Sequence, residues 1–283
     1  MNDTQLFIIG AKGQLGLALQ AQYPGAISAD ITELDITNHS SVEAYDWSGI
    51  KVIVNAAAYT NVDGAETPEG RIAAWKVNAT ALTHIVHAAS KHNITLVHIS
   101  SDYVFDGTQN PHTEAEPMSP LSVYGASKAA GDLIVSTLPK HYIVRTSWVI
   151  GDGKNFVRTM MELGNKGVNP TVVSDQIGRL TFTSELVRAI NHLLTTSPAY
   201  GTYNVSNEGA SVSWAEITRE VYKIAGLKNT VADITTAEYY AGKDGIAPRP
   251  LQSTLNLSKL HATGFTSRDW QDNLQEYLTK ETR

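Results

Sequence analysis

The sequence predicts an α/β protein in which a doubly wound parallel sheet is followed by a smaller C-terminal lobe. Three observations support this: short runs of β-branched residues, helix-length segments between them, and a glycine-rich turn directly after the first run. Buried parallel strands are apolar along their whole length, and each needs a crossover connection to reach its neighbour. Five such units in the first half therefore predict a Rossmann-type sheet.

The elements of the first half follow in order along the chain. The expected strands lie at residues 6–9, 26–27, 52–54, 95–99 and 142–144. The expected helices lie at about 15–19, 69–91 and 122–137, where apolar residues recur at helical spacing. In the second half we expect helices near 155–165, 183–195, 213–225 and 270–277, with short strands near 171–173 and 203–205. The last of these helices is amphipathic and is expected to pack against the sheet.

Composition narrows the class of protein. The 283 residues include 22 basic and 28 acidic side chains, a net charge of −6 with histidine neutral, and no cysteine. The absence of cysteine excludes disulfides, thiolate catalysis and sulfur-ligated metal sites. A mildly acidic chain without a basic block is not expected to bind nucleic acid or an anionic membrane. No apolar stretch has the length of a membrane helix, and the first residues do not resemble a signal peptide, so we expect a cytoplasmic protein.

The turn after the first strand has glycines at positions 10, 13 and 16. Such glycines let the backbone turn tightly and approach a pyrophosphate at the N-terminus of the next helix, where free N–H groups favour anions. Asp30 follows the second strand and is placed to accept hydrogen bonds from both hydroxyls of an adenosine ribose. This context predicts dinucleotide binding. Asp30 favours NADH, whereas Lys12 would partly neutralise the 2′-phosphate of NADPH, so the choice between them stays open.

A tyrosine and a lysine stand four residues apart at the start of the helix at 122–137, as Tyr124 and Lys128. Residues at positions i and i+4 share one helix face, so the phenol and the ammonium can converge. A nearby ammonium stabilises a phenolate and lowers the pKa of the tyrosine toward the range useful for proton transfer. Ser101, after the fourth strand, is placed to polarise a carbonyl.

These residues resemble the active site of the short-chain dehydrogenase/reductase superfamily, in its extended, nucleotide-sugar branch. Several blocks are similar to one family, dTDP-4-dehydrorhamnose reductase. They are residues 54–63 (VNAAAYTNVD), 100–107 (SSDYVFDG), 145–149 (RTSWV), 174–179 (SDQIGR) and Arg249-Pro250 with Ser253 and Leu255. The resemblance runs from the first strand to about residue 260.

The resemblance implies that the 4-keto group of dTDP-4-dehydro-L-rhamnose is reduced to dTDP-L-rhamnose, the last step of dTDP-rhamnose biosynthesis, with NADPH or NADH as cofactor. Tyr124 would donate the proton, Lys128 would hold the ribose and tune the tyrosine, and Ser101 would bind the carbonyl oxygen. The implied cofactor contacts are Gly10, Gly13, Gln14, Leu15, Gly16, Asp30, Asp35, Ile36, Ala57, Ala58, Tyr59, Thr60, Tyr124 and Lys128. The implied substrate contacts are Val62, Ser101, Asp102, Trp148, Asn155 and Arg249.

An acidic protein that binds a nucleotide diphosphate needs local positive charge. The second half offers such charge at Lys154, Arg158, Arg179 and Arg249. Each of these taken singly fits a solvated surface charge better, except Arg249, which prolines on both sides hold in place and which is a candidate phosphate clamp. Trp148 fits core packing and contact with the substrate equally well.

The residue assignments above also predict how the chain is divided into domains and whether it binds a metal ion. We expect a dinucleotide-binding Rossmann domain over residues 1–150, with some later segments returning to it, and a lobe over 151–283 that mainly binds substrate. Some members of the family hold a divalent cation partly through a glutamate two residues beyond the third glycine; Ala18 stands there, so no metal is expected. The nine histidines show no metal-ligand spacing.

Other functions stay open. A non-catalytic regulatory subunit, as in the β subunit of methionine adenosyltransferase, would share the cofactor site, but the complete set of Ser101, Tyr124 and Lys128 favours an enzyme. Another nucleotide-sugar reductase, an epimerase or a dehydratase is the second alternative. Asp102-Tyr103 stands where a dehydratase would carry an Asp-Glu pair, which argues against dehydration. The partner is expected to be the small dTDP-sugar, and the chain to be a monomer or homodimer.

Overall fold

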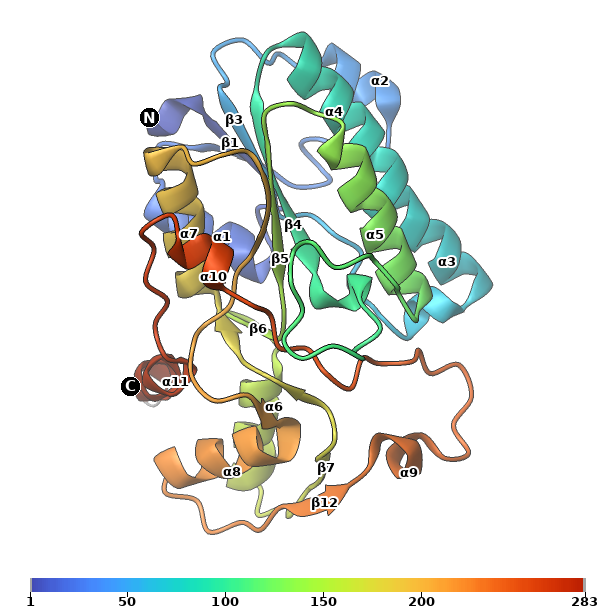
Figure 1. The fold of residues 1–283 in the computed structure, drawn as a ribbon, viewed down its shortest axis with the longest axis vertical. Helices are drawn as coiled ribbons and strands as arrows, with labels where there is room; N and C mark the ends of the chain where they lie inside the picture. The colour runs from blue at the N-terminus through green and yellow to red at the C-terminus, as the bar shows by residue number, and fades with distance from the viewer. Residues whose placement is uncertain (1, 282–283) are drawn as a thin grey trace.

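The computed structural model describes residues 2–281, and its largest sheet has six strands in the order β10-β5-β4-β3-β1-β2 (Figure 1). The strands are β1 (Leu6–Ile9), β2 (Ile27–Ala29), β3 (Val52–Asn55), β4 (Thr95–Ser101), β5 (His141–Thr146) and β10 (Gly201–Asn204). Every neighbouring pair in this sheet is parallel. The prediction of a doubly wound parallel α/β sheet is therefore confirmed.

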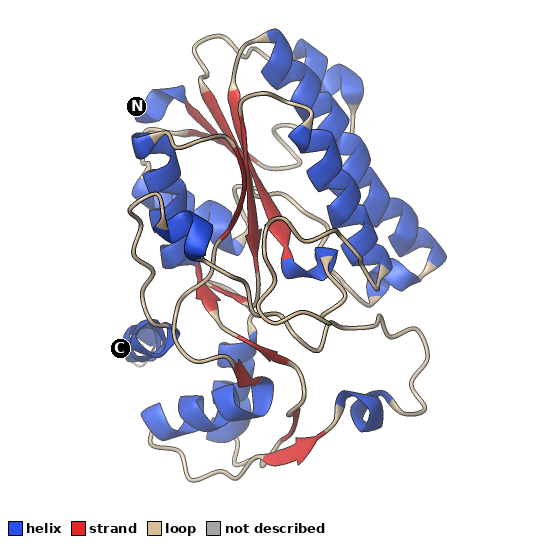
Figure 2. Ribbon diagram, viewed as in Figure 1, coloured by secondary structure: helices blue, strands red, loops and turns tan. Residues whose placement is uncertain are grey.

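Helices cover both faces of the six-stranded sheet (Figures 1 and 2). One face carries α1 (Gln14–Gln22), α7 (Thr183–Thr196) and α10 (Ser258–His261). The other carries α2 (His39–Ala44), α4 (Ala81–Lys91) and α5 (Val123–Ser136). The expected helix at 69–91 is one helical run made of α3 (Pro68–Trp75), a π-helical turn at Lys76–Thr80, and α4.

Successive side chains along each strand point to opposite faces of the sheet and so contribute to two hydrophobic cores, one on each face. In β1, Leu6 and Ile8 pack with α1 and α7, whereas Phe7 and Ile9 pack with α4 on the other face. All four side chains are buried, since successive side chains of a strand point to opposite faces and both faces are covered. This explains why the predicted strands are continuous apolar runs.

The six-stranded sheet includes chain from beyond residue 150. Strand β10 pairs with β5, with Tyr203 opposite Val144, and α7 packs against α1. The sheet therefore recruits one strand and two covering helices from the second half of the sequence.

Most of the remaining residues form a second lobe below the sheet, with a hydrophobic core of its own (Figure 1). Its helices are α6 (Phe156–Asn165), α8 (Trp214–Ile224), α9 (Thr236–Tyr240) and α11 (Trp270–Glu281). Its two-stranded sheets pair β6 (Val149–Ile150) with β9 (Thr181–Phe182), β7 (Thr171–Val173) with β12 (Ala232–Ile234), and β8 (Ile177–Gly178) with β11 (Val212–Ser213). No helix in residues 2–281 combines the length and apolar character that a bilayer crossing requires.

Helix α11 corrects one expectation. It packs on α8 and β9 and not on the six-stranded sheet, because Trp270 and Leu274 belong to the core of the second lobe. The apolar stripe of the helix was visible in the sequence, but the surface that covers it was not.

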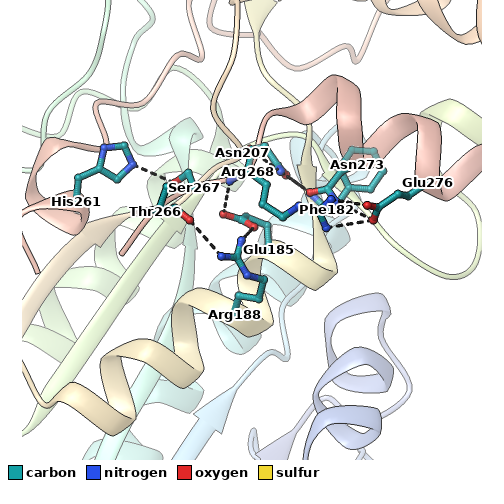
Figure 3. A network of polar contacts seen from close by, with 10 residues as sticks. All are labelled: Phe182, Glu185, Arg188, Asn207, His261, Thr266, Ser267, Arg268, Asn273 and Glu276. Atoms are coloured by element: carbon teal, nitrogen blue, oxygen red, sulfur yellow. Dashed lines mark hydrogen bonds and ion pairs between the residues drawn. The ribbon is translucent and has the colours of Figure 1, made fainter. Parts of the chain in front are cut away.

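A polar network ties α11 to α7 (Figure 3). The fully buried carboxylate of Glu185 on α7 accepts a hydrogen bond from the backbone N–H of Arg268 at 3.1 Å. Asn207 donates to the Arg268 carbonyl at 3.0 Å and to Asn273 Oδ1 at 2.7 Å, and accepts from the Phe182 N–H at 2.9 Å. One buried amide therefore links the end of β9, the chain before α11, and α11 itself.

We expect Asn207→Ala to lower the free energy of unfolding by about 2 to 4 kcal/mol, because it leaves buried donors and acceptors without partners. Denaturant unfolding followed by circular dichroism measures this. Asn165→Ala, at the exposed end of α6, is the matched control and should change stability by less than about 0.5 kcal/mol. Equal stability of the two variants would contradict the role given to Asn207.

Candidate active site

A cleft of about 1010 Å³ runs along the carboxyl ends of β1, β3, β4 and β5, between the six-stranded sheet and the second lobe. It opens where the chain order reverses, with β2 on one side of β1 and β3 on the other. Ligands of open α/β sheets bind at this kind of switch point. The predicted site residues that line the cleft are Gly10, Gly13, Gln14, Leu15, Asp30, Asp35, Ile36, Ala57, Ala58, Tyr59, Thr60, Val62, Ser101, Asp102, Tyr124, Lys128 and Trp148.

Two of the three glycines in this turn have no room for a side chain. Gly10 has a φ of +83°, and a Cβ there would lie 2.6 Å from the backbone nitrogen of Ala57. A Cβ on Gly16 would lie 2.1 Å from the Gly10 carbonyl oxygen, so Gly16 closes the turn from behind and does not line the cleft. Gly13 is the N-cap of α1 and offers no capping side chain, which leaves the first N–H groups of α1 for an anion.

Asp30 marks one end of the cleft. Its carboxylate accepts hydrogen bonds from the backbone N–H groups of Lys12 at 3.0 Å and Ile31 at 2.8 Å. The Lys12 ammonium lies 3.5 Å from Thr32 Oγ1, and Glu33 accepts from the Asp30 N–H at 2.9 Å. Two carboxylates and one ammonium therefore surround this end of the cleft. Asp30, which favours NADH, and Lys12, which favours NADPH, lie side by side, so the choice between the two cofactors stays open.

An asparagine that the sequence analysis missed holds the loop after β3. Asn78, in the π-helical turn, accepts from the Tyr59 N–H at 2.8 Å and donates to the Tyr59 carbonyl at 3.1 Å. It also donates to Ser127 Oγ at 3.0 Å, on α5 between Tyr124 and Lys128. A buried polar residue inside a helical run was the available signal, because such groups need partners.

Tyr124 and Lys128 lie on the first turns of α5, which Ser122 caps by accepting the Gly125 N–H at 3.1 Å. Both side chains are buried and both line the cleft. The Lys128 ammonium donates to the Ile99 carbonyl at 2.7 Å, which anchors α5 to the end of β4. The predicted trio is therefore brought together, since Ser101 ends that same strand.

Burial dominates the proton affinities in this trio. It raises the pKa of Tyr124 to about 12, and a hydrogen bond with Ser101 opposes the rise. Burial lowers the pKa of Lys128 to about 8, and the nearby Asp132 carboxyl opposes the fall. We expected Lys128 to lower the pKa of Tyr124; in this structure the loss of solvation outweighs any such effect, and the phenol keeps its proton at neutral pH.

A buried ion pair lies beneath Lys128. Asp132, one helical turn further along α5, accepts from Arg145 Nε at 2.9 Å, and both side chains are almost fully buried. Burial raises the pKa of Asp132, and the positive charge of Arg145 is the largest opposing effect. Arg145 also lies over the Phe105 ring, 5.2 Å from its centroid. The pair joins α5 to β5 directly under the trio.

Two hydroxyls at the end of β5 were also missed. Thr146 and Ser147 line the cleft, and their buried hydroxyl oxygens have no hydrogen-bond partner within residues 2–281. Buried hydroxyls without protein partners are candidates to bind a ligand. Their position within the RTSW block was the signal available in the sequence.

Trp148 takes part in both packing and lining. Its ring stacks on Trp214 with a centroid distance of 3.7 Å, and it also lines the cleft. Its φ is +48°, a left-handed conformation that is rare for a bulky residue. A Cβ on Gly178 would lie 2.9 Å from this indole, so the glycine lets the ring pack closely.

Asn155 and Arg249 do not line the cleft. Asn155 caps α6 by accepting the Arg158 N–H at 3.0 Å, and its amide donates to the Gly151 carbonyl at 2.8 Å. Arg249 forms a two-pronged ion pair with Asp63, at 2.5 and 2.9 Å. Both side chains therefore already have strong partners, and a role in phosphate binding stays a prediction that requires them to exchange those partners.

The predicted cationic cluster is not gathered at one place. Lys154 lines the cleft, whereas the buried Arg179 donates to the Leu255 carbonyl and Arg158 to the Gly153 carbonyl. Within residues 2–281, no group of three or more His, Cys, Asp or Glu side chains has a geometry that would hold a metal ion.

The glycine turn, the acidic residue after β2 and the Ser-Tyr-Lys trio in one cleft of a Rossmann-type sheet define an oxidoreductase of the dinucleotide-dependent class. The model of the RmlD substrate binding domain family matches residues 4–283. The dTDP-4-dehydrorhamnose reductase of Aggregatibacter actinomycetemcomitans is 36% identical over 96% of this chain and 97% of its own. The spore coat polysaccharide biosynthesis protein SpsK of Bacillus subtilis is 35% identical over 97% of both chains.

Solved structures agree. A dTDP-4-dehydrorhamnose reductase from Clostridium acetobutylicum has a TM-score of 0.91 at 36% identity, over 98% of this chain and 99% of its own. The Bacillus anthracis enzyme, solved in complex with NADP, has a TM-score of 0.89 at 37% identity, over 97% of this chain and 98% of its own. The chain belongs to the dTDP-4-dehydrorhamnose reductase family, and the resemblance seen in the sequence is confirmed.

Proposed function

We propose that the protein reduces the 4-keto group of dTDP-4-dehydro-L-rhamnose to give dTDP-L-rhamnose, with NADPH or NADH as cofactor. The observation that carries this proposal is the convergence of Ser101, Tyr124 and Lys128 in the cleft beside the glycine turn. Membership of the reductase family supports the substrate, since relatives over nearly the whole chain bear that name.

The cleft fits a dinucleotide at three points. Gly10 and Gly16 leave no space for a Cβ, the N-terminus of α1 has no side-chain cap, and Asp30 stands at the far end. In our proposal the pyrophosphate binds at residues 13–15, the adenosine ribose at Asp30, and the adenine between Asp35 and Ile36. Ala57, Ala58, Tyr59 and Thr60 then form the wall beside the nicotinamide half. When bound, the reduced cofactor supplies the hydride.

Three side chains of the protein supply and stabilise the proton transfer to the carbonyl oxygen. Tyr124 holds its proton at neutral pH because burial raises its pKa, so it is ready to donate that proton to the oxygen of the carbonyl that receives the hydride. Lys128, held between the Ile99 carbonyl and Asp132, binds the nicotinamide ribose and balances the tyrosinate left behind. Ser101 donates a hydrogen bond to the same carbonyl oxygen.

The substrate occupies the side of the cleft that faces the second lobe. Val62, Asp102 and Trp148 line that side and contact the sugar in our proposal. Asn155 and Arg249 bind the diphosphate only by exchanging their present partners, Arg249 giving up Asp63. In this proposal residues 1–150 bind the cofactor and also supply Val62, Asp102 and Trp148 to the sugar, and residues 151–283 complete the sugar-nucleotide site through Asn155 and Arg249.

We expect Tyr124→Phe to leave the Kd for the cofactor nearly unchanged and to lower kcat by about 10²-fold or more, the scale of lost general acid catalysis. The assay follows oxidation of NADPH or NADH with the dTDP-4-keto sugar. Tyr200→Phe, on the exposed surface, is the control and should keep full turnover. A wild-type protein that binds the cofactor tightly without turnover would point instead to a regulatory subunit.

Lys12 should discriminate between the two cofactors. We expect Lys12→Ala to weaken binding of NADPH about tenfold and that of NADH by less than about threefold, since one charge-assisted hydrogen bond to the 2′-phosphate is lost. Isothermal titration with both cofactors measures this. Lys140→Ala, whose ammonium contacts Asn93 away from the cleft, is the control. Equal losses for both cofactors would show that Lys12 does not face the 2′ position.

A further inference from the structure

The hydroxyl proton of Ser101 is already engaged. Ser101 Oγ donates to Asp102 Oδ1 at 3.0 Å and accepts from the Tyr103 backbone N–H at 3.2 Å. A hydroxyl has a single proton, and an ionised carboxylate can only accept. While Asp102 is ionised, Ser101 therefore cannot donate to Asp102 and to a substrate carbonyl at the same time.

We propose that Asp102 acts as a positioning residue in its neutral form, its carboxylic O–H donating to Ser101 Oγ so that the Ser101 proton points to the substrate carbonyl. This inference rests on the proposed reduction and adds the protonation state that the reaction needs. No covalent bond is made or broken at Asp102. Its proton stays on the carboxyl group, and only the direction of the hydrogen bond between the two side chains is reversed.

The surroundings of Asp102 favour the neutral form. The side chain is 2% exposed and stands in the wall of the cleft. Burial raises the pKa of Asp102 to about 6; hydrogen bonds from Ser253 and Ser101 and the charge of His112 oppose the rise. Bound substrate would remove further water from this wall and act in the same direction as burial.

The titratable groups around Asp102 come from three elements. Tyr103 follows it in the same turn, and its pKa lies above the usual value because of burial and the Asp102 charge. Tyr124 faces it from α5. His112 comes from the loop after β4, with Nδ1 2.8 Å from Glu116 and Nε2 3.0 Å from the Gln252 carbonyl, so that both nitrogens face acceptors. The two tyrosines stay protonated throughout the pH range of the test below.

The sign of the pH dependence follows. The folded pKa of Asp102 lies above its ordinary value, so the neutral form dominates below about pH 6 and declines above it. If only that form orients Ser101, kcat/KM falls about tenfold between pH 5 and pH 7. Loss of the Lys128 charge, with a pKa of about 8, reduces activity only at higher pH and is therefore separate.

The test compares pH profiles of Asp102→Asn and the wild type. The Asn amide donates to Ser101 without titrating, so the ratio of kcat/KM at pH 7 to that at pH 5 should change from about 0.1 to about 1. Asp102→Ala, which removes the acceptor of the Ser101 proton, should also give a ratio of about 1, whatever its absolute kcat/KM. Asp106→Asn, four residues away in the same loop, should keep the wild-type ratio. The ratio is the measured quantity, because a merely structural role would lower rates equally at both pH values.

Two results would overturn the inference while leaving the proposed reduction intact. The first is an active wild type whose kcat/KM does not change between pH 5 and pH 7. The second is a set of folded Asp102 variants that are either inactive or as pH-dependent as the wild type. A wild type that does not reduce the dTDP-4-keto sugar at any pH would instead remove the proposed function, and this inference with it.

A second measurement does not depend on turnover. Infrared difference spectra between pH 5 and pH 8 should contain a carboxylic acid C=O band that disappears in Asp102→Asn, with a midpoint near pH 6 in the wild type. If the two proteins give the same difference spectrum, Asp102 does not become neutral in this range and the inference fails.

Discussion

The ion pair between Asp132 and Arg145 is the contact on which the geometry of the candidate site depends. Two opposite charges lie almost fully buried at 2.9 Å, one on α5 and one at the end of β5. Removing one partner of such a pair typically costs about 3 to 5 kcal/mol, because the other charge is left in a poorly solvated place. Lys128 stands one helical turn before Asp132, so the pair sets both the position and the electrostatic surroundings of the lysine.

That arrangement also explains how three titratable groups share a buried site. Lys128 keeps a usable charge because Asp132 opposes the effect of burial, and its ammonium donates to the end of β4. At Tyr124 only a hydrogen bond with Ser101 opposes the effect of burial, and the side chain stays a neutral phenol. Asp102 lies between these cases, with two serine hydroxyls and a histidine partly offsetting burial. The same loss of water therefore affects the three groups differently, and in the proposed reduction each of these effects suits a different task.

The cleft needs both halves of the chain. Residues between Ile9 and Lys128 supply its floor at the switch point of the sheet, and residues 146–154 supply the opposite wall. The pair between Asp63 and Arg249 joins the loop after β3 to a segment nearly two hundred residues later, and Ala247 donates to the same carboxylate. The polar network of Asn207 and Glu185 adds a second link, between α7 and α11. The second lobe is therefore held against the sheet from both sides.

Local spacing was sufficient to predict much of this site. Glycines at intervals of three after an apolar run, an aspartate after the next strand, and a tyrosine four residues before a lysine are short-range patterns whose geometry follows from helix and strand periods. Ser101, Tyr124 and Lys128 were found in this way, and the structure brings them together. Spacing did not reveal Asn78, Thr146 or Ser147, whose significance depends on which buried atoms lack or find partners.

The sequence by itself determined the strand–helix order, the glycine turn and the candidate site residues Ser101, Tyr124 and Lys128, because these depend on residues within about one helical turn or one strand of each other. Only the tertiary structure decided that Arg249 pairs with Asp63, that Asn155 caps α6, and that α11 packs on the second lobe. It also decided the proton affinities of Tyr124, Lys128 and Asp102. Pairing and burial depend on which distant segments exclude water from a group, and residue order along the chain does not contain that information.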